Sequence, residues 1–189
     1  CSGMFTANSM NCLAEALGMA LPGNGTVLAT DPRRAALVSA AAERILHLIE
    51  ADTTPRQIVT RDAIDNAFIL DIGMGGSTNT VLHTLAIAQE AGIDYPLERL
   101  DQLSMATPYL CKVAPAGPYH VEDVDNAGGV PAILAELSRA GAPLHPHAQT
   151  VAGVPLGALY ENASTRNPDV IRSPDNPYSA RGGLSVLFG

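Results

Sequence analysis

Amphipathic segments of helical periodicity, each closed by glycine or proline, constrain the fold of this chain more than any other feature. Apolar residues recur in these segments at intervals of three and four positions, which is typical of helices with one buried face. Helices are expected at residues 6–20, 32–52, 61–72, 78–91, 97–105, 121–126 and 129–140. Strands are expected at residues 109–114 and 182–189. Because glycine lies at several junctions, where helices must pack closely, the sequence predicts an α/β fold with helices on a mainly parallel sheet.

The second of these segments carries the clearest apolar stripe. It starts at Asp31-Pro32, which combines an N-cap residue with proline in the first turn. The stripe is expected to be buried, and it consists of Leu37, Ala41, Ile45, Leu48 and Ile49.

Charge and cysteine content exclude several classes of function. The chain of 189 residues has 11 basic and 19 acidic residues, for a formal net charge of −8. Such a chain neutralises few phosphates, which argues against nucleic acid and anionic membranes as partners and leaves a small molecule. Three cysteines at irregular spacing predict no disulfide framework. A reducing compartment is therefore expected, either the cytoplasm or the stroma or matrix of an organelle.

Cys1 is the first candidate functional residue. It stands ahead of Ser2-Gly3, a polar cluster and then a predicted helix. The positive end of a helix dipole favours thiolate, the form of cysteine that binds metal. A small buried residue is the alternative, and it is the commonest fate of a free cysteine.

A glycine-rich turn at Gly73–Asn79 is the second candidate. It precedes a predicted helix, so its backbone N–H groups can face an anion, and Ser77, Thr78 and Asn79 add side-chain donors. The dinucleotide fingerprint would require glycine in place of Thr78, so that interpretation is weak. A cap that lets the backbone pack closely is the alternative.

The remaining polar residues have plainer explanations. Cys12 and Cys111 lie in apolar segments without the spacing of a ligand set, so both are expected to be structural. His120 with Glu122 and Asp123 suggests a metal site, but carboxylates in a first helical turn also stabilise the helix, and this capping role is preferred.

The other basic side chains receive no functional role from the sequence. Lys112 is expected to be solvated, and His83 to be packed or half exposed on a helix. His145 and His147 flank Pro146 in a loop, and a pair this close can chelate a metal without that having a function.

The residue order from Cys1 to Leu13 closely resembles the third cluster-cysteine segment of the dihydroxy-acid/phosphogluconate dehydratase family. Further resemblance lies in residues 71–91, 110–115, 120–129 and 176–184. Pro22-Gly23-Asn24-Gly25 resembles the dihydroxy-acid branch more than the phosphogluconate branch. The resemblance implies part of an N-terminal cluster-binding domain with the α/β fold expected above.

The resemblance also implies a chemistry. Dehydratases of this branch convert 2,3-dihydroxy-3-methyl acids to 2-keto acids in valine and isoleucine biosynthesis. An iron–sulfur cluster, expected to be 2Fe-2S, is held by three cysteines and leaves one iron open as a Lewis acid. Mg²⁺ binds the substrate carboxylate and 2-hydroxyl. Cys1 would then be a cluster ligand, and the substrate would be bound by Gly75, Gly76, Ser77, Thr78 and Asn79.

The chain resembles about the middle third of such an enzyme. The Cys-Asp-Lys segment, the upstream cysteine and the later domain with a metal-binding glutamate and a serine base have no counterpart in it. Residues 1–161 would be the second half of the cluster domain, 162–181 a linker or loop, and 182–189 the first strand of the C-terminal domain. No catalytic residue is assigned, the isolated chain is expected to be inactive, and the whole protein is expected to be a homodimer.

Two alternatives stay open. The first is that the chain belongs to a sugar-acid dehydratase, acting on an aldonate or on phosphogluconate, within the same family. Otherwise it is a non-enzymatic module that binds small anions at the Gly75–Ser77 turn, with Cys1 an ordinary thiol.

Overall fold

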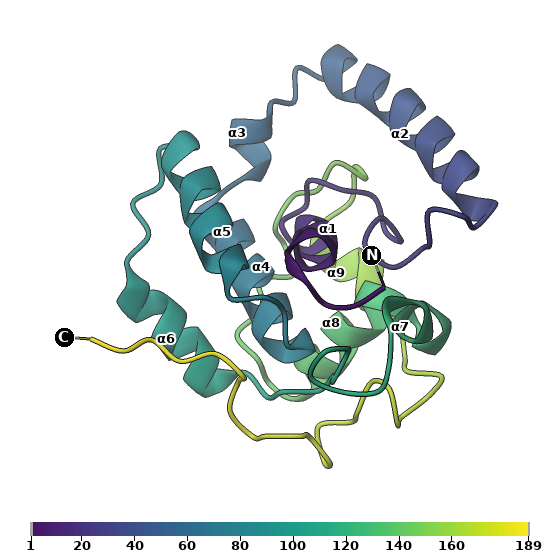
Figure 1. Ribbon diagram of the computed structural model, residues 1–189. Coiled ribbons are helices and arrows are strands. Elements are labelled where there is room, and N and C mark those ends of the chain that lie inside the picture. Colours follow the sequence, from purple (N-terminus) through teal and green to yellow (C-terminus); the bar gives the residue numbers. More distant parts are fainter. Residues whose placement is uncertain (1, 189) are drawn as a thin grey trace.

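Helices dominate the computed structural model, which describes residues 2–188 (Figure 1). The longer helices are α1 (Thr6–Ala16), α2 (Arg33–Glu50), α4 (Arg61–Met74), α5 (Asn79–Glu90), α6 (Leu97–Ala106) and α8 (Gly129–Arg139). The shorter helices are α3 (Pro55–Ile58), α7 (Val121–Ala127) and α9 (Leu156–Tyr160). All seven expected helices are confirmed, although α1 ends earlier than expected because the chain turns at Gly18, whose φ is 79°.

The central element is α4, around which α1, α5, α6 and α8 pack. It begins at Thr60, whose hydroxyl accepts a hydrogen bond from the Ala63 N–H at 3.2 Å, and it ends at Gly75 in the left-handed conformation. Every residue from Ala63 to Met74 is buried. Because these residues point to every side of the helix, α4 requires neighbours around its whole circumference. The helices α1, α5, α6 and α8 supply these neighbours.

The expected parallel sheet is wrong. Within residues 2–188 the β-structure consists of isolated bridges, which pair Tyr109 with Ser179, Cys111 with Ile171 and Val113 with Tyr119. The expected strand at 109–114 is extended, but the N–H groups of Leu110 and Cys111 both donate to the carbonyl of Gly73, at 2.8 and 3.3 Å. Two backbone donors of this segment are therefore satisfied at the C-terminal end of α4, while Tyr109 and Ala114 donate to the carbonyls of Ser179 and Tyr119 in isolated bridges and not in a ladder.

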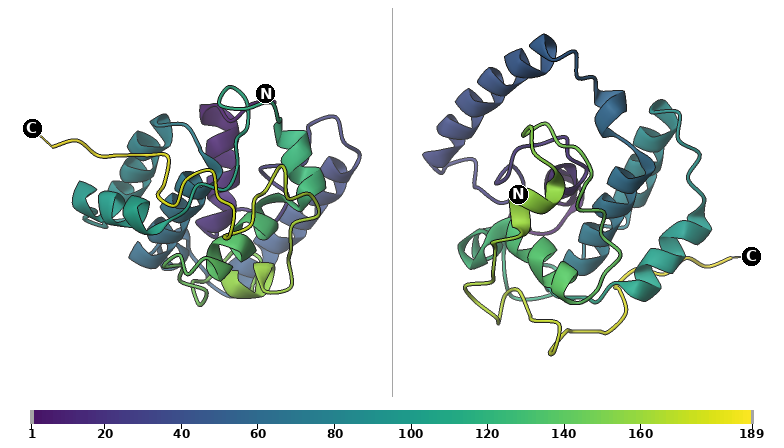
Figure 2. Two further views of the ribbon diagram at one scale, coloured as in Figure 1. Left: turned by 90° about the horizontal axis from the view of Figure 1, so that it is seen from below. Right: turned by 180° about the vertical axis from the view of Figure 1, so that it is seen from behind.

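The prediction of a strand at residues 182–189 is also wrong over residues 182–188, which are the ones that the structure describes. This segment runs along the outside of the helices and passes α6 (Figures 1 and 2). The Gly182 N–H donates to the Ser104 carbonyl of α6 at 2.9 Å. A carbonyl near the end of a helix thus again accepts the backbone hydrogen bond that a neighbouring strand would accept in a sheet.

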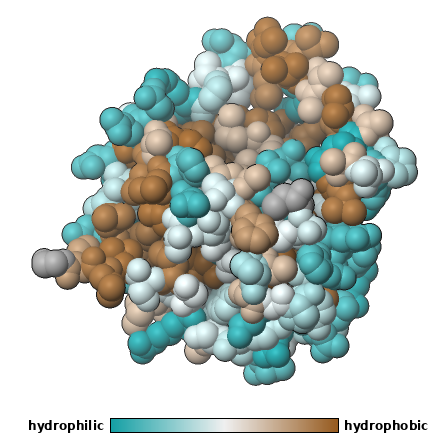
Figure 3. All heavy atoms as spheres, viewed as in Figure 1, coloured by the Kyte–Doolittle hydropathy of each residue, from teal (hydrophilic) through white to brown (hydrophobic). Residues whose placement is uncertain are grey.

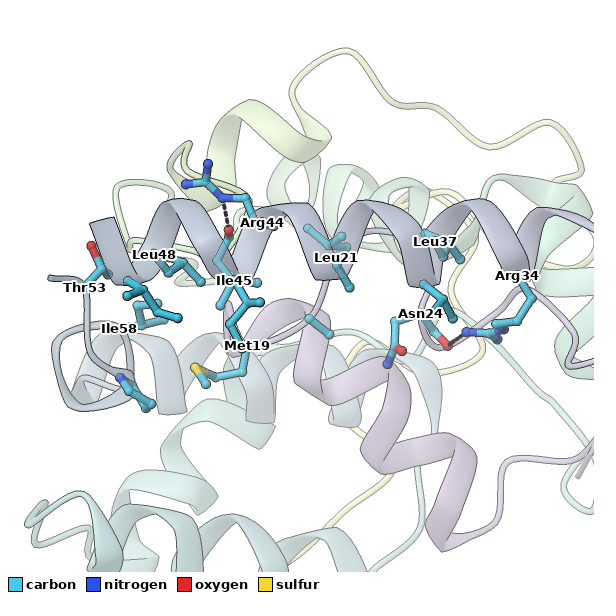
Figure 4. Close-up of a pocket in the computed structure, with 16 residues that line it drawn as sticks. Met19, Leu21, Asn24, Arg34, Leu37, Arg44, Ile45, Leu48, Thr53 and Ile58 are labelled. Atoms are coloured by element: carbon cyan, nitrogen blue, oxygen red, sulfur yellow. Dashed lines mark hydrogen bonds between the residues drawn. The ribbon is translucent and has the colours of Figure 1, made fainter. Parts of the chain in front are cut away.

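The expected burial of the α2 stripe is wrong as well. No residue of α2 is buried, and Ile45 and Ile49 are 56% and 69% exposed. The helix stands apart from the body, and apolar side chains are visible over it (Figures 1 and 3). Beneath it lies a cavity of about 570 Å³, in which Ile45 and Leu48 face Met19 and Ile58 (Figure 4).

None of the helices in residues 2–188 combines the length and the apolar character that a bilayer crossing requires.

Candidate functional site

Three segments that are far apart in the sequence meet next to the N-terminus. The Val121 N–H donates to the Ser2 carbonyl at 2.8 Å, and the Met4 N–H donates to the Ala114 carbonyl at 2.7 Å. These bonds join the opening residues to the segment before α7. Cys1 itself lies outside the described residues.

The third segment is the turn of residues 75–79 between α4 and α5. The Ser77 N–H donates to the Ser9 hydroxyl of α1 at 3.0 Å. The Asn79 side-chain amide donates to the Thr6 hydroxyl at 2.8 Å. The structure thus brings the glycine-rich turn and the residues that follow Cys1 together, although about 70 positions separate them.

Most backbone N–H groups of this turn are already used. Gly76 donates to the Asp71 carbonyl at 2.9 Å, and Asn79 donates to the Ser77 hydroxyl at 3.3 Å. Among the turn residues 75–79, the Thr78 N–H alone has no hydrogen-bond acceptor within the described part of the chain. Thr78 is also exposed, so its N–H and hydroxyl are the free donors that an incoming anion would meet.

Asp71 lies directly beneath this turn, and no functional role was expected for it from the sequence. Its side chain is 1% exposed, and Oδ1 has no hydrogen-bond partner. A Cβ atom on Gly76 would collide with this same Oδ1, so only glycine fits over the carboxyl group. Burial raises the pKa of Asp71 to about 7, and a hydrogen bond with Thr80 opposes this shift. The signal in the sequence was an acidic residue within the apolar run of residues 67–73, one turn before Gly75 and Gly76.

Cys12 and Cys111 do not face the site as thiolates. They are 1% and 0% exposed, and burial raises the pKa of Cys12 well above its usual range and that of Cys111 to about 12. Such thiols stay protonated and are poor metal ligands, which agrees with the structural role expected of them. The described residues therefore do not fit an iron–sulfur cluster, because they offer no thiolate donor.

The described residues near the turn do not complete a magnesium site either. Mg²⁺ takes oxygen ligands in octahedral geometry, and the buried carboxyl group next to the turn is that of Asp71. Its Oδ2 is engaged by Thr80 at 2.6 Å, and Gly76 covers Oδ1. A bound Mg²⁺ would need ligands from beyond this chain.

Of two neighbouring features, one has the role that its position predicts and the other does not. The capping role of Asp123 is confirmed, since its carboxylate accepts from the His120 N–H at 2.7 Å. Lys112 is not simply solvated, because its ammonium lies 4.8 Å from the centre of the Tyr178 ring.

A buried glutamate fixes the turn that follows α1. Glu15 is 4% exposed, and its carboxylate accepts from the N–H groups of Gly23 and Gly25 at 3.1 and 2.7 Å. Burial raises the pKa of Glu15 to about 7 despite these two bonds. Gly25 in turn packs against Cys12, where a side chain would collide with the backbone of that cysteine. The Pro22–Gly25 motif thus has a structural role, because Glu15 and Cys12 of α1 hold this turn in place.

Comparison with known proteins places this arrangement in a family. Residues 1–159 match the family model described as dihydroxy-acid/6-phosphogluconate dehydratase N-terminal. The chain therefore belongs to the dihydroxy-acid/6-phosphogluconate dehydratase family. Over all 189 residues it is 53% identical to a dihydroxy-acid dehydratase of Aquifex aeolicus (strain VF5). The chain covers 34% of that relative, so it spans about a third of the length of the curated protein that it matches.

Proposed function

We propose that this chain is part of a dihydroxy-acid dehydratase, a hydro-lyase that converts 2,3-dihydroxy-3-methyl acids to 2-keto acids in valine and isoleucine biosynthesis. The observation that carries the proposal is the 53% identity to a dihydroxy-acid dehydratase across the whole chain. The contact between the turn at 75–79 and the residues after Cys1 supports it, because the two candidate motifs share one surface.

The roles that we propose for individual residues follow from the ligand atoms and hydrogen-bond donors that these residues offer. An iron–sulfur cluster, 2Fe-2S by resemblance, and Mg²⁺ would be completed by other parts of the polypeptide, with Cys1 as one cluster ligand. Gly75, Gly76, Ser77, Thr78 and Asn79 would form the substrate-binding wall, in which the Thr78 N–H and hydroxyl meet the carboxylate of the acid. A homodimer in the cytoplasm, or in an organelle stroma or matrix, stays a prediction.

The test uses the whole protein that contains this chain, purified without oxygen. Its activity is measured on 2,3-dihydroxy-3-methylbutanoate and on an aldonate. Thr78→Val keeps the side-chain shape but removes the hydroxyl. A lost hydrogen bond to a charged group costs about 1.5–3 kcal/mol, so kcat/KM should fall by about 10- to 100-fold. Thr30→Val, at an exposed turn residue, is the matched control and should leave kcat/KM unchanged.

Each other outcome assigns the chain differently. Turnover of the aldonate alone would favour the sugar-acid dehydratase alternative. An iron-free protein that turns over neither acid but binds inorganic phosphate would favour the anion-binding module. Equal kcat/KM for Thr78→Val and wild type would remove the turn from the substrate site.

A further inference from the structure

A separate cluster of possible metal ligands lies at the N-terminal end of α4. Asp62 is in the first turn of this helix, and His145 and His147 lie in the loop after α8. Within residues 2–188, one carboxylate oxygen and one ring nitrogen from each histidine lie within 4.8 Å of one another. His147 Nε2 is 3.0 Å from Asp62 Oδ2, and His145 Nδ1 is 3.6 Å from Asp62 Oδ1.

The His145 backbone is held in place by a buried amide. Asn66 is fully buried on α4, and its Oδ1 accepts from the His145 N–H at 2.7 Å. Its Nδ2 donates to the His145 carbonyl at 3.0 Å. Both backbone groups of His145 are thus fixed to the central helix, so the loop is positioned before any ligand binds.

The His145 ring is oriented by a second carboxylate. Its Nε2 lies 3.2 Å from Oδ2 of Asp65, which is 2% exposed. Asp65 also accepts hydrogen bonds from the Arg99 guanidinium and from the Tyr95 hydroxyl, each at 2.5 Å, so its carboxylate serves as an acceptor for the His145 ring as well. When Nε2 donates to this carboxylate, Nδ1 is the ring nitrogen that faces Asp62 and that a metal ion can reach. Metal-binding histidines are commonly oriented in this way, with the second ring nitrogen donating to a carboxylate.

We propose that Asp62, His145 and His147 bind a divalent transition-metal ion of the Zn²⁺ class. Two imidazoles and one carboxylate favour Zn²⁺, whereas Mg²⁺ and Ca²⁺ prefer oxygen donors throughout. Three protein ligands leave at least one position to water. A bound ion would join the 145–147 loop to the first turn of α4, and it would replace the direct contact between His147 Nε2 and Asp62 Oδ2.

The test measures Zn²⁺ binding to the whole protein that contains this chain. Equilibrium dialysis with metal analysis should find one more Zn²⁺ per chain in wild type than in His147→Ala. His147 is 73% exposed at its side chain, so this variant should fold. His83→Ala is the matched control, because His83 is an exposed histidine on α5 and should bind Zn²⁺ like wild type.

A second variant and a second readout complete the test. Asp62→Asn should weaken Zn²⁺ binding at least 10-fold, and Zn²⁺ should raise the melting temperature of wild type and His83→Ala but not of His147→Ala. Equal Zn²⁺ binding by wild type and both site variants would overturn the proposal. Displacement of the Zn²⁺ by a tenfold excess of Mg²⁺ would overturn the assignment of nitrogen ligands.

Discussion

The Asp71 carboxyl is best explained at the residue scale as a neutral group. The Thr80 hydroxyl lies 2.6 Å from Asp71 Oδ2 and also contacts the Ser77 carbonyl. One hydroxyl proton cannot serve both acceptors. When Asp71 is ionised, Thr80 donates to Oδ2, and this is the hydrogen bond that opposes the rise in pKa. When Asp71 is protonated, it can donate to Thr80 Oγ1 while Thr80 donates to Ser77, so both contacts are hydrogen bonds. This arrangement agrees with the pKa of about 7 that burial produces.

A protonated Asp71 predicts a pH-dependent stability. Between about pH 4 and pH 7 the folded state keeps a proton that the unfolded state has lost, so the free energy of unfolding falls as the pH rises. Asp71→Asn should reduce this slope by up to ~1.4 kcal/mol per pH unit. Denaturant unfolding at several pH values measures the slope. Glu15, whose pKa is also raised to about 7, should contribute with the same sign.

The exposed Asp175→Asn is the matched control for this measurement, and it should keep the wild-type slope. If Asp71→Asn and wild type give parallel curves between pH 4 and pH 7, Asp71 is ionised in the folded protein.

At the scale of elements, α4 and α2 show how the same kind of sequence pattern leads to different burial. Both were expected to bury apolar residues, yet α4 is enclosed and α2 is not. The helix α2 itself meets the body through polar bonds, such as the Arg44 Nε–H that donates to the Val151 carbonyl at 2.5 Å. The cavity beneath α2 separates its apolar side chains from the core (Figure 4).

This contrast predicts unequal costs of truncation. Phe68→Ala removes a fully buried ring from α4 and should lower the free energy of unfolding by about 3–5 kcal/mol. Val38→Ala on α2 removes a side chain that is 64% exposed and should cost less than about 0.5 kcal/mol. Urea denaturation followed by circular dichroism compares the two. Similar losses would mean that α2 is packed in solution.

On the scale of the whole molecule, the sealed thiols limit what this chain can do alone. Cys12 lies beneath Gly25, and Cys111 is fully buried. Neither can reach a cluster without unfolding its surroundings. If Cys1 is a cluster ligand as proposed, the other thiolates would have to come from elsewhere in the polypeptide.

Reconstitution tests this dependence. Residues 1–189 treated with iron and sulfide without oxygen should show no charge-transfer bands in the visible spectrum after desalting, and no turnover of a dihydroxy acid. The whole protein should show the bands, and Cys1→Ser in the whole protein should weaken or abolish them. Stoichiometric iron retained by residues 1–189 alone would contradict the prediction.

The sequence by itself determined the features that depend on neighbouring residues. The helices at 61–74 and 79–90, the Thr60 cap and the bond between His120 and Asp123 follow from local hydrogen bonding and apolar spacing. The family was also readable from the residues around Cys1 and Gly75–Asn79.

Only the tertiary structure decided what depends on distant parts of the chain. It showed that the extended segments bond to helix ends in place of a sheet, that the α2 stripe faces a cavity, and that Asp71 lies beneath Gly76. It also joined Asp62 to His147, 85 positions away. The physical reason is that burial and ligand geometry depend on which surfaces meet in space. The local periodicity of a sequence does not determine which surfaces meet.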